Sequence, residues 1–134
     1  MGMVNKRAFA WLALIGLFLA GCNAGPKTYP VTGTVTVDGQ PLKEADILFA
    51  PLDATLGPDA GQIRDGKFGF QAKAGTKRVQ IRASRPILTK TAMGETTIWK
   101  NYLPARYNSQ TILQAEVTPQ GDNDFTFALH TGAN

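Results

Sequence analysis

The sequence has little of the chemistry on which many enzymes and metal proteins depend. It contains one cysteine, Cys22, and one histidine, His130, among 134 residues. One cysteine excludes a disulfide within the chain, and a zinc site needs three or four suitable ligands held together. A serine triad would have to use His130 with Ser84 or Ser109, and no nucleophile elbow surrounds either serine. We therefore expect no catalytic residues, no metal and no cofactor.

Long apolar runs are also scarce. The one such run is residues 8–20 (AFAWLALIGLFLA), which follows Lys6 and Arg7 and precedes small residues. These are the positive, hydrophobic and cleavage regions of a secretory signal. The run is shorter than the ~20 apolar residues of an ordinary membrane-spanning helix. The pattern predicts an exported protein rather than a polytopic membrane protein.

Cys22 lies directly after that run, in the stretch "LAGCN". The stretch resembles the bacterial lipoprotein box, which implies cleavage before Cys22 and lipidation of its thiol. The alternative is a buried free cysteine, which is disfavoured because a signal segment has no folded core around it. The partner implied by lipidation is a membrane, reached through the lipid anchor. Asn23 after the cysteine, rather than aspartate, implies delivery to the outer membrane more than retention at the inner one.

Beyond residue 29 the pattern changes to strands. Val31, Gly33, Val35 and Val37 alternate with threonines, and Asp38-Gly39 then supplies a tight turn. Similar strand patterns occur at residues 45–51, 62–64, 67–70 and 76–84, and in two strands around residues 119–123, with Phe125, Phe127 and Leu129 facing the core. Residues 86–107 are expected to form one long irregular loop. About seven short strands without helical periodicity are typical of an antiparallel β-sandwich.

Three of these segments carry a family resemblance. Residues 31–51 (VTGTVTVDGQPLKEADILFAP), 63–70 (IRDGKFGF) and 73–83 (KAGTKRVQIRA) resemble the carboxypeptidase regulatory-like (transthyretin/prealbumin-like) domain. Residues 103–129 look like small bacterial envelope lipoproteins that carry this domain. The resemblance implies a seven-stranded antiparallel Greek-key β-sandwich. Lys77 stands where the family often has an aromatic residue, and we expect it at a strand end in contact with solvent.

The resemblance implies no activity by itself, because fold does not carry function. The zinc chemistry of carboxypeptidases belongs to a separate catalytic domain. A transthyretin-like enzyme that hydrolyses a purine-breakdown product has several histidines and arginines and a Tyr-Arg-Gly-Ser C-terminus, whereas this sequence has one histidine and ends His130-Thr131-Gly132-Ala133-Asn134. The expected domain organisation is a lipoprotein signal peptide (1–21), a lipidated tether (22–29) and a β-sandwich domain (30–134).

The candidate binding surface lies in residues 86–107. It consists of Trp99, Tyr102, Arg106 and Tyr107. Aromatic and arginine side chains are favoured anchors of protein interfaces, and aromatic rings also stack on sugars. The alternative is that these rings cover an open edge of the sandwich, which is favoured for Tyr107 and equally weighted for Trp99.

Two other groups of residues have simpler interpretations. Asp122, Asn123 and Asp124 offer oxygen ligands for calcium, but without a full ligand pattern a turn is favoured. A second group, Arg78, Gln80 and Arg82, is expected to form a solvated outer stripe. His130 is expected to be exposed after the last strand.

Charge supports no nucleic-acid partner. The formal net charge is +4, and it falls to +2 without Lys6 and Arg7, with no long basic run elsewhere. The sequence thus predicts a lipid-anchored cell-envelope β-sandwich module with a non-catalytic binding or structural role toward protein or glycan. The alternatives are an enzyme with an unfamiliar site near residues 86–107 and a purely structural spacer.

Overall fold

A computed structural model describes residues 25–132, which form an all-β chain with one short helical turn. The predicted lipidation site Cys22 and the signal segment lie outside the described residues. The elements are β1 (Thr28–Val37), β2 (Gln40–Pro41), β3 (Glu44–Pro51), β4 (Asp59–Arg64), β5 (Lys67–Lys73), β6 (Gly75–Arg82), β7 (Ser84–Thr91), β8 (Gly94–Asn101), the 3₁₀ turn η1 (Ala105–Tyr107), β9 (Gln114–Val117) and β10 (Asp124–Leu129). Within the described part of the chain, no helix has the length and apolar character needed to cross a membrane.

Two tight turns follow from Asp-Gly pairs. Asp38 and Gly39 have φ values of 50° and 83°, and Asp65 and Gly66 have φ values of 50° and 75°. Two consecutive positive φ values match the twist of the flanking strands and favour aspartate and glycine. The turn predicted at Asp38-Gly39 is confirmed, and Asp65-Gly66 forms a second turn of the same kind.

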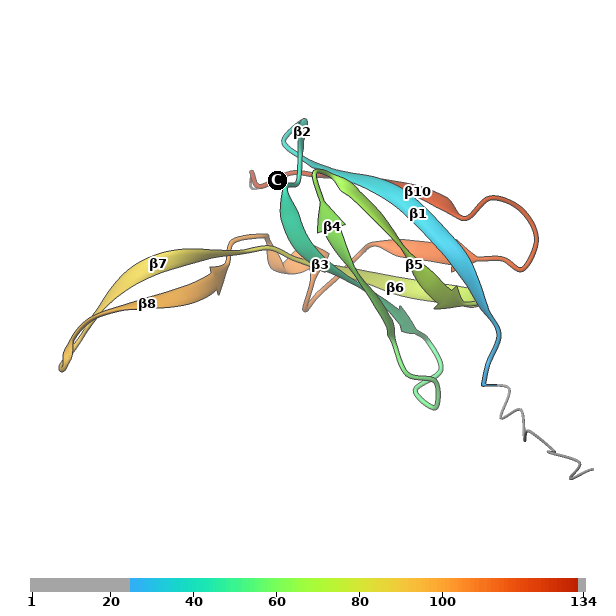
Figure 1. The fold of residues 1–134 in the computed structure, drawn as a ribbon, viewed down its shortest axis with the longest axis horizontal. Coiled ribbons are helices and arrows are strands. Elements are labelled where there is room, and N and C mark those ends of the chain that lie inside the picture. The colour runs from blue at the N-terminus through green and yellow to red at the C-terminus, as the bar shows by residue number, and fades with distance from the viewer. Residues whose placement is uncertain (1–24, 133–134) are drawn as a thin grey trace, which may run out of the picture.

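The main sheet has the strand order β10-β1-β5-β4-β3-β6-β9, with β2 paired to β1 (Figure 1). Its neighbours are antiparallel except β1 and β10, which run parallel from Thr32↔Asp124 to Val37↔Leu129. The expectation of a wholly antiparallel arrangement is therefore wrong at this edge. Residue alternation fixes which face of a strand is buried, but it says nothing of the direction in which a distant strand returns.

The sheet curls strongly, so that its two halves face each other in a β-sandwich-like arrangement. Phe49 on β3 contacts Phe68 and Phe70 on β5, with ring centroids 6.3 and 5.0 Å away, and Phe125 on β10 at 5.8 Å. Between β4 and β5 the register pairs Arg64 with Lys67 alone, beside the turn. This turn is where one half of the sheet passes into the other.

The core forms from the inward residues of both halves. Val79, Ile81 and Ala83 are completely buried, as is Leu129, and Phe127 is 7% exposed. The predicted inward positions of Phe127 and Leu129 are confirmed. They follow from period-two alternation, which places every second side chain on the same face of a strand.

Gly33 allows the closest approach between strands in this core. A Cβ atom there would overlap the backbone oxygen of Phe125 and the ring of Phe68. Glycine is therefore required by packing at a position where the strand pattern alone would accept valine.

Lys77 differs from expectation. It lies on the same face of β6 as Val79 and Ile81 and is 1% exposed, so its predicted contact with solvent at a strand end is wrong. Every second residue of β6 points inward, and this alternation extends to Lys77, two residues before Val79. Burial lowers the pKa of its amino group; nearby Asp59 opposes this effect and nearby Lys73 adds to it.

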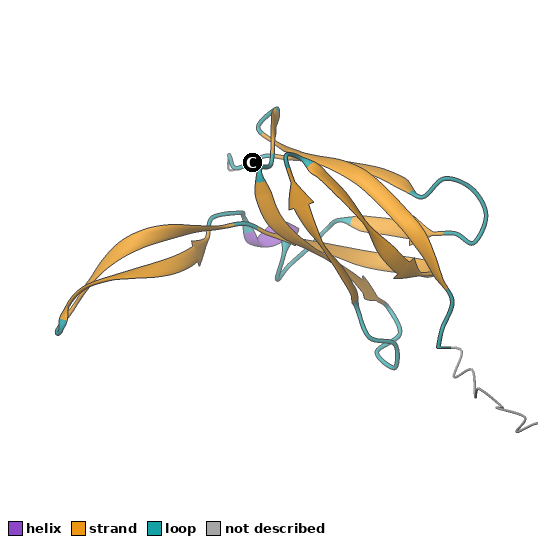
Figure 2. Cartoon of the chain, viewed as in Figure 1, coloured by secondary structure: helices purple, strands orange, loops and turns teal. Residues whose placement is uncertain are grey.

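Residues 86–107 do not form the expected long loop. β7 and β8 pair in register from Ser84↔Asn101 to Thr91↔Gly94 and make a separate two-stranded sheet. We call residues 84–101 the arm, because this hairpin projects from one end of the main sheet (Figure 2). Its residues are largely exposed on both faces, so no apolar alternation marked its strands, although threonine and isoleucine favour them.

Candidate functional site

A row of polar side chains crosses the outer face of three neighbouring strands. The register places Asp46 of β3 between Gln62 of β4 and Arg82 of β6. Glu44 pairs with Arg64 one step along the same face. All five are exposed, because the strand parity that buries Ile47, Ile63 and Ile81 turns them outward. The row therefore combines an amide, carboxylates and guanidinium groups on one rigid surface.

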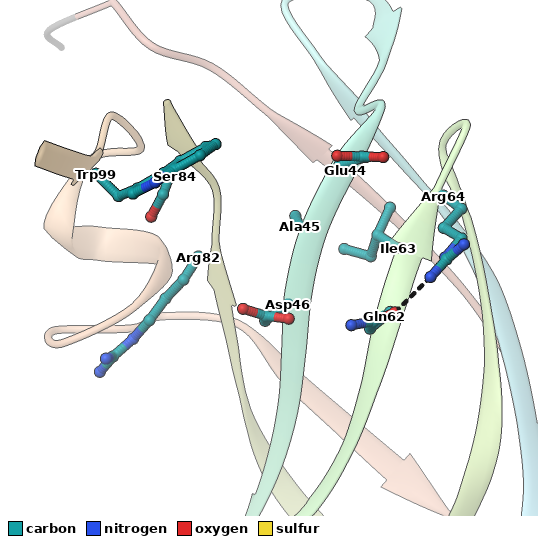
Figure 3. A pocket seen from close by; sticks show the side chains of 9 residues that line it. All are labelled: Glu44, Ala45, Asp46, Gln62, Ile63, Arg64, Arg82, Ser84 and Trp99. Atoms are coloured by element: carbon teal, nitrogen blue, oxygen red, sulfur yellow. Dashed lines mark hydrogen bonds between the residues drawn. The ribbon is translucent and has the colours of Figure 1, made fainter. Parts of the chain in front are cut away.

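This row lies in an open hollow of about 250 Å³ at the root of the arm (Figure 3). We call it the central hollow. Its lining residues come from β3, β4, the end of β6 and the two strands of the arm: Glu44, Ala45, Asp46, Gln62, Ile63, Arg64, Arg82, Ser84 and Trp99. Figure 3 shows Trp99 and Ser84 on one side and Arg64 on the other, with Glu44 and Asp46 between them.

The polar groups of the central hollow remain open to a ligand. Arg64 donates from Nη2 to Oε1 of Gln62 at 3.0 Å, and Arg82 donates to Oε1 of Gln80 at 3.5 Å. Neither Glu44 nor Asp46 takes part in an ion pair within residues 25–132. The hollow thus offers carboxylate acceptors and guanidinium donors side by side.

Trp99 contributes an aromatic surface to this polar hollow. It lies on β8 opposite Pro86 of β7, and 73% of the residue is exposed. An indole normally buries a large apolar area in a folded protein. Its exposure beside polar side chains makes it a platform on which a flat apolar face can stack.

Tyr102 lies beside an adjoining hollow. It is 38% exposed, and the guanidinium carbon of Arg85 lies 5.4 Å from its ring centroid. Its backbone nitrogen donates to the oxygen of Ala83 at 3.0 Å, which fixes the residue to the end of β6. This second hollow, of about 480 Å³, is lined by Lys43, Glu44, Arg64, Asp65, Ser84, Arg85 and Tyr102.

Arg106 and Tyr107 lie elsewhere, so the structure does not bring the four predicted surface residues together. Arg106 donates to the backbone oxygens of His130 and Gly132, the latter at 2.9 Å. Tyr107 is 5% exposed, and its hydroxyl accepts from the His130 nitrogen at 2.8 Å. Desolvation acts to raise the pKa of Tyr107, but hydrogen bonding to His130 and the neighbouring Arg106 lower it overall. This pair fastens the segment after β10.

The remaining sequence candidates have structural roles. Asn123 is buried; its Oδ1 accepts from the Thr118 nitrogen and its Nδ2 donates to the Thr118 oxygen, both at 2.9 Å. The interpretation of this segment as a turn is confirmed for Asn123. His130 follows β10 with its side chain 70% exposed, as expected. In residues 25–132 no three His, Cys, Asp or Glu side chains gather where they could hold a metal ion.

Sequence reasoning found Trp99 and Tyr102 but missed the polar row beside them. The sequence places Arg82 in a solvated stripe and gives no reason to single out Asp46 or Gln62. The sequence does show alternation in residues 44–46, 62–64 and 80–82, which assigns every second side chain of each segment to the outer face of its strand. Alternation cannot show that these side chains lie next to one another, because that depends on the register of the three strands.

Comparison with known proteins adds little to this description. No protein-family model matches the chain, and no curated protein matches it. Among solved structures, a 9R-lipoxygenase from Cyanothece PCC8801 is similar at 11% identity with a TM-score of 0.34. The match covers 77% of this chain and 16% of the lipoxygenase chain. At that TM-score it bears on neither the fold nor the function.

Proposed function

We propose that this protein is a lipid-anchored cell-envelope module that binds glycan without catalysis, through the central hollow. The observation that carries the proposal is the exposed indole of Trp99 beside the row of Gln62, Asp46 and Arg82. The role is one of binding, with the arm root and the outer face of β3 as its surface.

The chemistry of the central hollow suits a sugar. A pyranose ring has an apolar face of C–H groups, which can stack on an aromatic ring, and an edge of hydroxyls. Each hydroxyl both donates and accepts hydrogen bonds. Carboxylates that only accept, such as Asp46, and guanidinium groups that only donate, such as Arg82, can therefore both be satisfied by one ligand.

A protein partner and an enzyme are supported less well. Hot spots of protein interfaces cluster in well-packed, desolvated pockets, whereas this hollow is open and lined mainly by polar groups. For an enzyme near residues 86–107, the Tyr107 hydroxyl is a candidate acid–base group, but the backbone of His130 already holds it. Release of reducing ends from a bound oligosaccharide would favour the enzyme instead.

We also propose the prealbumin type of Greek-key sandwich as the finer fold. The facing halves of the curled sheet and the phenylalanine contacts between them support it. Seven strands lie along the path of the main sheet, in agreement with the number that the resemblance implies.

The lipid anchor at Cys22 is part of the same proposal and rests on the "LAGCN" stretch. Several acyl chains would hold the protein firmly, since one chain alone gives marginal membrane binding. Cells grown with labelled palmitate should label the wild-type protein but not Cys22→Ser. An unlabelled wild type would contradict the anchor and leave the binding proposal standing.

Titration of residues 25–132 with neutral oligosaccharides tests the binding role. Trp99→Ala should weaken binding about tenfold or more, equivalent to about 1.4 kcal/mol, by removing the stacking platform. Leu88→Ala is the matched control, because Leu88 is also an exposed apolar residue of the arm (66%) but does not line the central hollow. Equal loss in both variants, or loss in neither, would contradict the proposal.

A further inference from the structure

Three hollows on the outer face join into one trough. The central hollow shares Glu44, Arg64 and Ser84 with the hollow beside Tyr102. It shares Asp46 and Arg82 with a third hollow of about 310 Å³. The third hollow is lined by Asp46, Ile47, Leu48, Ala60, Gly61, Gln80 and Arg82. Shared walls make the three a continuous surface along β3.

The trough is longer than one sugar ring. From Glu44 to Leu48 four residue steps of β3 cover about 13 Å at about 3.3 Å per residue. The hollow beside Tyr102 continues past Glu44 to Lys43 and Asp65. A single pyranose would fill one of these hollows and leave the others to water.

Two aromatic rings mark successive positions in the trough. Trp99 lines the central hollow and Tyr102 lines the hollow next to it; Trp99 lies at the root of the arm and Tyr102 directly follows the arm. Stacking platforms in adjacent hollows suit adjacent rings of one chain. The third hollow has Leu48 in place of an aromatic ring.

The charge along the trough favours a neutral ligand. Its lining carries four basic residues and three acidic ones: Lys43, Arg64, Arg82 and Arg85 against Glu44, Asp46 and Asp65. The two signs are mixed along the trough, because Glu44 lies opposite Arg64 and Asp46 lies opposite Arg82. A polyanion would meet Glu44 and Asp46 in the middle, and a polycation would meet Arg64 and Arg82.

We infer that the trough binds a chain of several neutral sugar residues lying along β3, and not a monosaccharide or a charged polymer. This inference rests on the proposed glycan-binding role and specifies its ligand class. The sugar at Trp99 is the central one, and chain extension toward Tyr102 adds a second stacked ring.

Calorimetric titration with β-1,4-linked glucose and N-acetylglucosamine oligomers of increasing length tests the inference. Affinity should rise severalfold from disaccharide to tetrasaccharide for at least one series. Tyr102→Ala should remove most of that gain while leaving disaccharide binding within about twofold. Trp99→Ala should weaken binding at every length. Ile112→Ala serves as the control, since Ile112 is exposed (71%) and lies outside the trough.

The possible results distinguish failure of the extended-chain inference from failure of the glycan-binding role. Equal affinity for disaccharide and tetrasaccharide would overturn the extended-chain inference and leave glycan binding intact. Tighter binding of a polygalacturonate oligomer than of either neutral series would overturn the assignment of a neutral ligand. Binding to none of these sugars would overturn the glycan role itself.

Discussion

The main sheet and the arm are built from the same kind of hairpin but are held in different ways. Strands β3 and β6 bury one face against the other half of the sheet, with Phe49, Val79 and Ile81 fully enclosed. Strands β7 and β8 leave both faces largely open, with Leu88, Ile98 and Trp99 exposed, as is Met93 in the turn between them. An isolated two-stranded hairpin is at best marginally stable in water. The main sheet therefore supplies the stability, and the arm supplies exposed surface.

The root of the arm nevertheless belongs to the main sheet. The Oδ1 atom of Asn101 accepts from the nitrogens of Ala83 at 3.1 Å and Leu103 at 3.3 Å, and Leu103 is buried. These contacts fix the end of β8 against the end of β6. Position along the arm therefore matters, because the anchored root carries Trp99, with Tyr102 directly after it, whereas the tip projects away from the main sheet (Figure 1).

The largest expected effect concerns a glycine of the main sheet. In Gly33→Ala the new methyl group would overlap the Phe125 oxygen and the Phe68 ring. We expect the free energy of unfolding to fall by about 1–3 kcal/mol, as for overpacked cores. Urea denaturation of residues 25–132 measures the change.

Gly69→Ala is the matched control, because the nearest atom to its added Cβ would lie 3.9 Å away. Restricting the unfolded chain there should change stability by no more than about 1 kcal/mol, in the favourable direction. If both glycine variants lose the same stability, close packing at Gly33 is not what limits the strand.

A smaller effect, of opposite sign, is expected at Lys77. Lys77→Met replaces a buried amino group with an apolar side chain of similar length, and should raise the free energy of unfolding at pH 7 by about 1 kcal/mol. Lys67→Met, on the exposed face of β5, should change it by less than about 0.5 kcal/mol. Denaturant unfolding of the three proteins gives both differences.

The same variant carries a pH signature. Because burial lowers the folded-state pKa of Lys77 below its ordinary value of 10.5, the unfolded chain binds more protons between the two values. Wild-type stability should therefore gain from this group as pH rises through that window. The advantage of Lys77→Met over wild type should shrink there; an advantage that stays constant up to pH 10.5 would contradict the assignment.

The smallest effect is expected at the tip of the arm. Leu88 and Thr97 are paired, so residues 89–96 can be replaced by Asn-Gly, which closes a two-residue hairpin. Stability should change by less than about 0.5 kcal/mol, because the deleted residues are surface residues. Sugar affinity should stay within twofold, since Trp99 is retained. A large loss of either would show that the tip, and not only the root, acts with the main sheet.

The strands that bury one face could be predicted from the sequence. The strands of the arm, which are exposed on both faces, could not. Val31, Val35 and Phe127 alternate with polar residues because water lies on one side and the core on the other. The arm has water on both sides, so its strands produced no such pattern. The inward position of Lys77 was missed because a charged residue is ordinarily read as exposed.

The candidate site was recovered in its aromatic part alone. Trp99 and Tyr102 stand out by residue type, whereas Asp46, Gln62 and Arg82 are ordinary outward residues of three different strands. Their proximity comes from the pairing of β4, β3 and β6. Conversely, Arg106 and Tyr107 resemble binding residues by type, but they are occupied by the backbone of residues 130–132.

The parallel pairing of β1 with β10 has a consequence for the order of folding. The Thr32 hydroxyl donates a hydrogen bond to the Asp124 carboxylate, 92 residues away in the chain. The edge of β1 that pairs with β10 therefore stays unpaired until nearly the whole described chain is present. Pairings of such high contact order form late, because loop closure costs entropy before the contact is made. During synthesis, the β3–β4 and β4–β5 hairpins can form as they emerge. The curled sheet closes last, and until then the edge of β1 is exposed to other chains.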